Sequence, residues 1–97
     1  MKNNIEVEIC TFSLESCLNA QLAGASRVEL CSGMYDGGTT PSAAMIRMAR
    51  EKLSIQLYVM IRPRGGDFLY SDLEFEMMKE DIRYAKACRA DGVVLGI

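Results

Sequence analysis

Strand-like and helix-like segments alternate along this chain, and the alternation restricts its fold more than any other feature of the sequence. Residues 5–10 alternate apolar and polar side chains, as a strand with one buried face does, and residues 27–31 repeat the pattern. Two apolar segments, 55–62 and 93–97, have the composition of buried strands. Stretches with apolar side chains at helical spacing separate the four segments. Such units form a parallel sheet with helical crossovers, so we expect an α/β fold.

Capping residues mark where the helices are expected to begin. Ser13 is a typical N-cap residue, and Thr40-Pro41 combines an N-cap residue with a proline at the first helical position. Ser71-Asp72-Leu73-Glu74 has the sequence of a capping box and opens the longest helix, which Gly92 is expected to end. The apolar side chains expected on one face of that helix are Phe75, Met78, Ile82 and Ala85.

The chain is short enough for all four strand segments to belong to one domain. Its 97 residues contain no linker or low-complexity tract. We therefore expect a single domain over 1–97, consisting of about the first four βα units of a (β/α)8 TIM barrel, or half of one. The last strand then has no helix to cover it, and an uncovered strand tends to pair with another chain. The sequence thus predicts either an incomplete unit or an obligate assembly, such as a homo-oligomer.

Composition and charge favour a cytoplasmic protein that binds neither nucleic acid nor membranes. The net charge of −2 gives no reason to expect a polyanionic partner, and the apolar runs are too short to span a bilayer. The first four residues lead directly into a strand segment, without the apolar region of a secretory signal. The cysteines are therefore expected to be thiols; they are Cys10, Cys17, Cys31 and Cys88.

Polar side chains are expected on the inner face of the barrel. If Ile5, Val7 and Ile9 pack on helices, the alternate residues of each strand face the barrel axis. The predicted inward set is Glu6, Glu8, Cys10, Arg27, Glu29, Cys31, Tyr58, Met60 and Arg62. Barrel interiors are normally apolar, and buried charges are costly unless paired. The inward charges must therefore pair with one another, meet a ligand, or both.

The loop Arg62-Pro63-Arg64-Gly65-Gly66-Asp67 is the sharpest local motif. Two arginines beside a proline can present guanidinium forks to a carboxylate or phosphate, so Arg62, Arg64 and Asp67 are candidate ligand-binding residues. In the alternative interpretation, Arg62 pairs with Glu8 or Glu29, and Asp67 only shapes the turn. The residues leave both interpretations open.

Four motifs together resemble the CutC copper-homeostasis family, in its order and at its spacing. They are Val7-Glu8-Ile9-Cys10, Arg27-Val28-Glu29-Leu30-Cys31, Gly37-Gly38-Thr39-Thr40-Pro41-Ser42 and Ile61-Arg62-Pro63-Arg64-Gly65-Gly66-Asp67-Phe68. The resemblance implies a TIM barrel, a cytoplasmic location, self-association and copper homeostasis through Cu(I) binding. It carries the family's candidate copper ligands to Cys10 and Cys31. Family members are expected to be about twice as long as this chain.

Copper binding is the first of three functional hypotheses. Cu(I) is a soft ion that accepts thiolate sulfur, and Arg62 near the cysteines would favour the thiolate form. Zinc is less suited, because the chain has no histidine and two cysteines do not complete a tetrahedral site. Cys17 and Cys88 lie on expected helices and are interpreted as structural. The alternative is that Cys10 and Cys31 are only packing residues.

The second hypothesis is an enzyme that acts on a small anionic metabolite, although no activity can be assigned. Glu8 or Glu29 would be the general acid or base, and Arg62 with Arg64 would hold the anion. Salt-bridged glutamates explain the same residues without catalysis. The third hypothesis is a truncated half barrel that is non-functional or depends on assembly, for instance through two halves that close one barrel.

Overall fold

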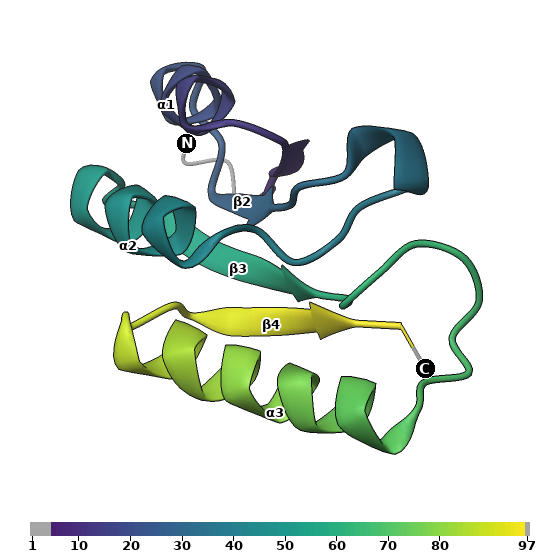
Figure 1. Cartoon of the computed structure of the whole chain (residues 1–97). Coiled ribbons are helices and arrows are strands. Elements are labelled where there is room, and N and C mark those ends of the chain that lie inside the picture. Colours follow the sequence, from purple (N-terminus) through teal and green to yellow (C-terminus); the bar gives the residue numbers. More distant parts are fainter. Residues whose placement is uncertain (1–4, 97) are drawn as a thin grey trace.

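The computed structural model describes residues 5–96, which form a four-stranded parallel sheet with three helices (Figure 1). The strands are β1 (Glu8–Thr11), β2 (Arg27–Leu30), β3 (Gln56–Ile61) and β4 (Gly92–Leu95), and they lie in chain order across the sheet. The helices are α1 (Leu14–Leu22), α2 (Ala43–Lys52) and α3 (Asp72–Ala87), with a short 3-10 helix η1 (Met34–Asp36) after β2. The predicted α/β fold is confirmed, and the sheet is consistent with part of a TIM barrel. Residues 1–4 and 97 of the predicted domain and last strand lie outside the described residues.

The core lies between the helices and one face of the sheet. The side chains of the two central strands on this face are fully buried, and they meet apolar side chains from all three helices. The core residues are Cys17, Ala20, Ala25, Val28, Leu30, Ile46, Ala49, Leu53, Leu57, Val59, Ile61, Met78 and Ala85. Because the strands are parallel, their carboxyl ends share one side of the molecule, where the loops after β2 and β3 extend together (Figure 1).

Two of the three predicted helix starts are confirmed, and the third is displaced. The Ser13 hydroxyl accepts the Ser16 N–H at 3.0 Å, and Ser71 with Glu74 forms the full capping box. However, α2 is capped by Ser42 and not by Thr40. The Thr40 hydroxyl instead accepts the Arg62 N–H at 2.8 Å, so Thr40 ties its loop to the end of β3.

Two predictions about α3 are wrong. Arg89, with a positive φ of 66°, follows the C-cap at Cys88 and ends the helix, whereas Gly92 is the first residue of β4. A Cβ atom at Gly92 would lie 2.7 Å from the Tyr58 ring, which explains the glycine there. Phe75 does not share the buried face, because it is 51% exposed with the Lys79 ammonium 5.4 Å from its ring centroid.

The apolar side of the first strand does not pack on helices as predicted. Ile5, Val7 and Ile9 are 73%, 46% and 36% exposed, and β1 begins only at Glu8. The physical reason is that β1 is an edge strand with β2 as its only partner among residues 5–96. Thr11 is the buried residue of β1, and its hydroxyl lies 3.1 Å from the Cys17 sulfur of α1.

Candidate functional site

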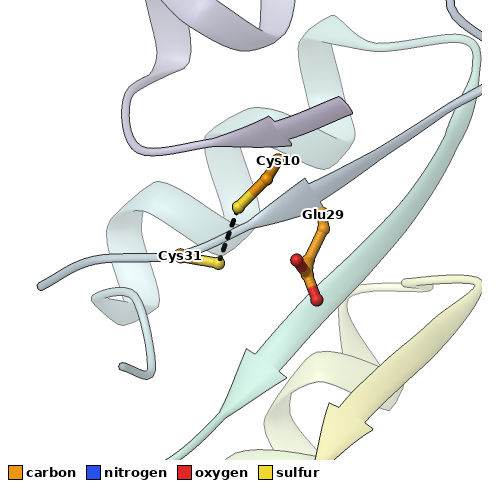
Figure 2. A group of neighbouring side chains, drawn as sticks. All are labelled: Cys10, Glu29 and Cys31. Atoms are coloured by element: carbon orange, nitrogen blue, oxygen red, sulfur yellow. Dashed lines mark hydrogen bonds between the residues drawn. The ribbon is translucent and has the colours of Figure 1, made fainter. Parts of the chain in front are cut away.

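Two cysteines meet at the carboxyl end of the sheet, on the face that the helices leave open. Cys10 lies in β1, and Cys31 directly follows β2. Their sulfur atoms are 3.8 Å apart. Figure 2 shows the two side chains pointing toward each other, with a dashed line between the sulfur atoms. The parallel register sets Cys10 beside Glu29, two residues before Cys31, so all three side chains project from the same face. Adjacent strands in register therefore bring together two residues that are 21 positions apart in the chain.

Glu29 completes this three-residue group. One carboxylate oxygen and the two sulfur atoms all lie within 4.8 Å of one another, a spacing at which they can hold a single metal ion (Figure 2). The sequence had suggested Glu29 as an acid or base, or as a partner of Arg62, although its place two residues before Cys31 already put both side chains on one face of the strand. We call Cys10, Glu29 and Cys31 the cysteine–glutamate group.

Both thiols in the group hold their protons more tightly than a free cysteine does. Cys31 is 1% exposed, whereas Cys10 is exposed. Burial is the main cause that raises the pKa of each thiol, and the nearby Glu29 carboxylate raises both further. The expectation that Arg62 favours the thiolate is therefore wrong for this structure: its guanidinium group is bound to backbone carbonyls, and desolvation dominates.

The charged row beside the group is paired internally. The Arg27 Nε atom donates to Glu8 at 2.6 Å, and its guanidinium carbon lies 4.3 Å from the Tyr58 ring centroid. The alternative in which Arg62 pairs with Glu8 is therefore wrong, because the in-register neighbour Arg27 occupies that carboxylate. This pairing also accounts for Glu8 without any catalytic role.

The arginine loop is held together by its own guanidinium groups. Arg62 donates to the carbonyls of Asp36, Gly38 and Gly66, and so joins the loop after β2 to the loop after β3. Arg64 donates to both carboxylate oxygens of Glu74, at 2.7 and 3.3 Å, to Asp67, and to loop carbonyls. Ligand contact by Arg62, Arg64 and Asp67 stays a prediction, since these hydrogen bonds describe only how the loop is shaped.

The remaining cysteines lie outside the group, as expected for structural residues. Cys17 is buried in the core against the Thr11 hydroxyl, and Cys88 is the C-cap of α3. Burial is also the main cause that raises the pKa of Cys17. Neither residue belongs to a metal-ligand group among residues 5–96.

Comparison with known proteins identifies the family. The model of the CutC family matches residues 5–97. The chain belongs to the CutC family. It is 54% identical over 94 residues to the copper homeostasis protein cutC homologs of Mus musculus and of Homo sapiens, and 58% identical over 97 residues to the CutC family protein of Bacteroides fragilis. These alignments cover 97%, 97% and 99% of this chain, but only 35%, 34% and 38% of the relatives.

A solved CutC structure has the same fold. The crystal structure of CutC from Streptococcus agalactiae superimposes with a TM-score of 0.90 at 46% identity. The match covers 96% of this chain and 46% of that one. The expectation of relatives about twice as long was too low for the curated proteins, of which this chain spans little more than a third.

Proposed function

We propose that this chain contributes to copper homeostasis by binding Cu(I) through Cys10 and Cys31 in the cytoplasm. The observation that carries the proposal is the 3.8 Å separation of their sulfur atoms, within a family whose relatives are named for copper homeostasis. Soft sulfur donors suit Cu(I), as they also suit zinc, so the donor set fits this ion. The free thiols agree with a reducing compartment.

The sulfur separation fits a bent arrangement around one ion. With metal–thiolate bonds of about 2.3 Å, sulfur atoms 3.8 Å apart subtend an angle of about 110° at a shared ion. A linear two-coordinate ion would need the sulfur atoms more than about 4 Å apart. The geometry therefore leaves room for at least one more ligand beside the two cysteines.

Binding requires the release of protons from the thiols. Because burial and Glu29 raise the pKa of both cysteines, both are protonated in the metal-free chain at neutral pH. A thiolate is the metal ligand, so uptake of the ion displaces protons to solvent. The partly exposed Cys10 gives solvent and an incoming copper carrier access to the buried Cys31.

A competition titration against a Cu(I) chelator under anaerobic conditions tests the proposal. We expect Cys10→Ser and Cys31→Ser each to abolish competition, because neither variant retains two thiolates. Cys88→Ser is the matched control, since it removes a thiol outside the group. Equal Cu(I) affinity in the parent chain and both serine variants would refute the proposal.

The enzymatic alternative receives no specific support from these contacts. Glu8 is paired with Arg27, and the guanidinium groups of Arg62 and Arg64 are bound to carbonyls and Glu74. Glu29 is the remaining carboxylate of the original hypothesis, and it lies with the cysteines. Its position supports metal binding better than proton transfer to an anionic metabolite.

A further inference from the structure

A methionine on β3, Met60, lies near Cys31 on the open face of the sheet. The register pairs Leu30 with Val59, so the next residues, Cys31 and Met60, continue the same row across β2 and β3. Met60 is half-buried, and strand alternation directs its side chain to the open face, away from its buried neighbours Val59 and Ile61. Cys10, Cys31 and Met60 therefore lie at the carboxyl ends of three adjacent strands, on the same face of the sheet.

Gly38 shows that Met60 and Cys31 border the same small space. This glycine is buried, with a positive φ of 107°. A Cβ atom built there would lie 3.6 Å from the Cys31 sulfur and 3.6 Å from the Met60 terminal methyl carbon. The missing side chain leaves both groups room to move toward each other. The Gly38 carbonyl accepts a hydrogen bond from Arg62 at 3.1 Å, which holds this part of the loop in place.

The bent sulfur geometry leaves room for a further ligand, and two candidate side chains lie nearby. Glu29 offers a hard carboxylate oxygen, which suits Zn(II), whereas Met60 offers a soft thioether, which suits Cu(I). Resting on the proposed function, we infer that Met60 is the third ligand of the site and makes it select Cu(I) over Zn(II). Methionine has three rotatable side-chain bonds, so the Met60 side chain can adjust its position toward an ion held by Cys31.

Methyl NMR on the 97-residue chain labelled with [methyl-13C]methionine observes this ligand directly. Silver(I) serves as a diamagnetic probe with the same preference for sulfur as Cu(I). Of the seven methionine methyl groups, we expect that of Met60 to shift most on addition of one equivalent. The resonance is assigned by its absence from Met60→Leu, which keeps the volume of the side chain.

Metal competition supplies the second readout. We expect Met60→Leu to lower Cu(I) affinity on the order of tenfold, as loss of a supporting group at a metal site does, and to leave Zn(II) affinity unchanged. Met48→Leu is the matched control, because Met48 is also half-buried but lies on α2. It should change neither affinity, and circular dichroism checks that both variants are folded.

Three outcomes would overturn the inference. If the Met60 methyl is unmoved and Met60→Leu binds Cu(I) like the parent, while the serine variants of Cys10 and Cys31 do not bind, Met60 is not a ligand but the proposed function stands. If Met60→Leu weakens Zn(II) and Cu(I) equally, the methionine only packs. If the parent itself binds no Cu(I), the inference and the proposed function fail together.

Discussion

At the scale of single residues, the protonation of two thiols controls the proposed chemistry. Cys31 is buried and Cys10 lies against it, so both thiols resist ionisation. The same protons are the ones that a metal must displace.

We predict that Cu(I) affinity rises steeply with pH. Since both pKa values lie above the ordinary value of 9.0, each thiol still carries its proton between pH 6 and 8. Release of two protons per ion then raises the apparent affinity by about a hundredfold per pH unit. Chelator competition at pH 6, 7 and 8, with the chelator's own protonation taken into account, measures the slope. A slope of one proton or none contradicts two-thiolate binding.

The same pKa shifts make the metal-free chain less stable in alkali. Folding raises the pKa of the Cys31 thiol above its value in the unfolded chain, near 9.0. Below pH 9 the thiol is protonated in both states, so its contribution to stability is fully present. As the pH rises from there toward the folded pKa, the unfolded chain releases the proton more readily than the folded chain, and the free energy of unfolding falls. We therefore expect urea denaturation to show lower stability at pH 10 than at pH 8. Cys31→Ala should lose less stability than the parent over this interval, because it lacks the buried titrating group.

The sequence predicted which side chains share the open face, but not how they pair. Period-two alternation correctly directed Cys10, Glu29 and Cys31 to one side, because side-chain direction is a local property of a strand. The partner of Glu8 depends on register, which places Arg27 next to it. Likewise, the local sequence predicted that Thr40 caps a helix, yet its hydroxyl accepts a hydrogen bond from the backbone N–H of Arg62, 22 residues later.

At the scale of elements, one half-buried arginine, Arg50, joins a helix to two strand starts. Arg50 of α2 is 17% exposed and donates to Asp91 and to the carbonyls of Leu53 and Ile55. Asp91 also accepts the Leu57 N–H at 2.8 Å. The hydrogen bond from the Leu57 N–H is the largest cause that lowers the pKa of Asp91, and the hydrogen bond from Arg50 lowers it further. The end of α2, the start of β3 and the turn before β4 are thus fixed together.

We predict that Arg50→Met destabilises the chain by about 2 kcal/mol, because it leaves several partly buried carbonyl groups without a donor. Arg47→Met is the control: Arg47 is 54% exposed and pairs with Glu51 one turn away, so its loss should change stability by about 0.5 kcal/mol or less. Urea denaturation at pH 7 measures both. Equal effects of the two substitutions would show that Arg50 does not join the elements.

A second prediction at this scale concerns the loop between β3 and α3. Arg64 bridges the loop carbonyls and the Glu74 carboxylate, which also caps α3. Arg64→Lys loses the fork geometry, so we expect faster amide exchange over residues 64–70 while the first turn of α3 stays protected by its Ser71 cap. The control is Arg83→Lys, in an exposed pair with Glu80. Hydrogen exchange read by mass spectrometry should find no change in that variant.

At the scale of the whole molecule, the sheet is open at both sides. Within residues 5–96, β1 and β4 each pair with one strand only. Apolar side chains of these outer strands are exposed, Ile9 at 36% and Leu95 at 44%, as is Val7 just before β1 at 46%. No helix in the described part of the chain is long and apolar enough to cross a membrane. The βα order predicted both the sheet and an uncovered last strand. It did not predict the exposure of the first strand, because that exposure depends on what lies beside the strand in space, which periodicity does not encode.

We predict that these open edges make the 97-residue chain associate with itself in solution. Unpaired edge strands with apolar side chains pair with other chains, and lysine on an edge suppresses such pairing. Sedimentation velocity at micromolar concentration should therefore show species larger than the 10.8 kDa monomer.

The double variant Val7→Lys with Ile9→Lys should shift the distribution toward monomer. Asn19→Lys with Ala44→Lys adds the same charge on the exposed surfaces of α1 and α2, so it should leave association unchanged. A parent chain that sediments as a monomer would contradict assembly through the sheet edges, whereas equal effects of the two double variants would assign the association to net charge.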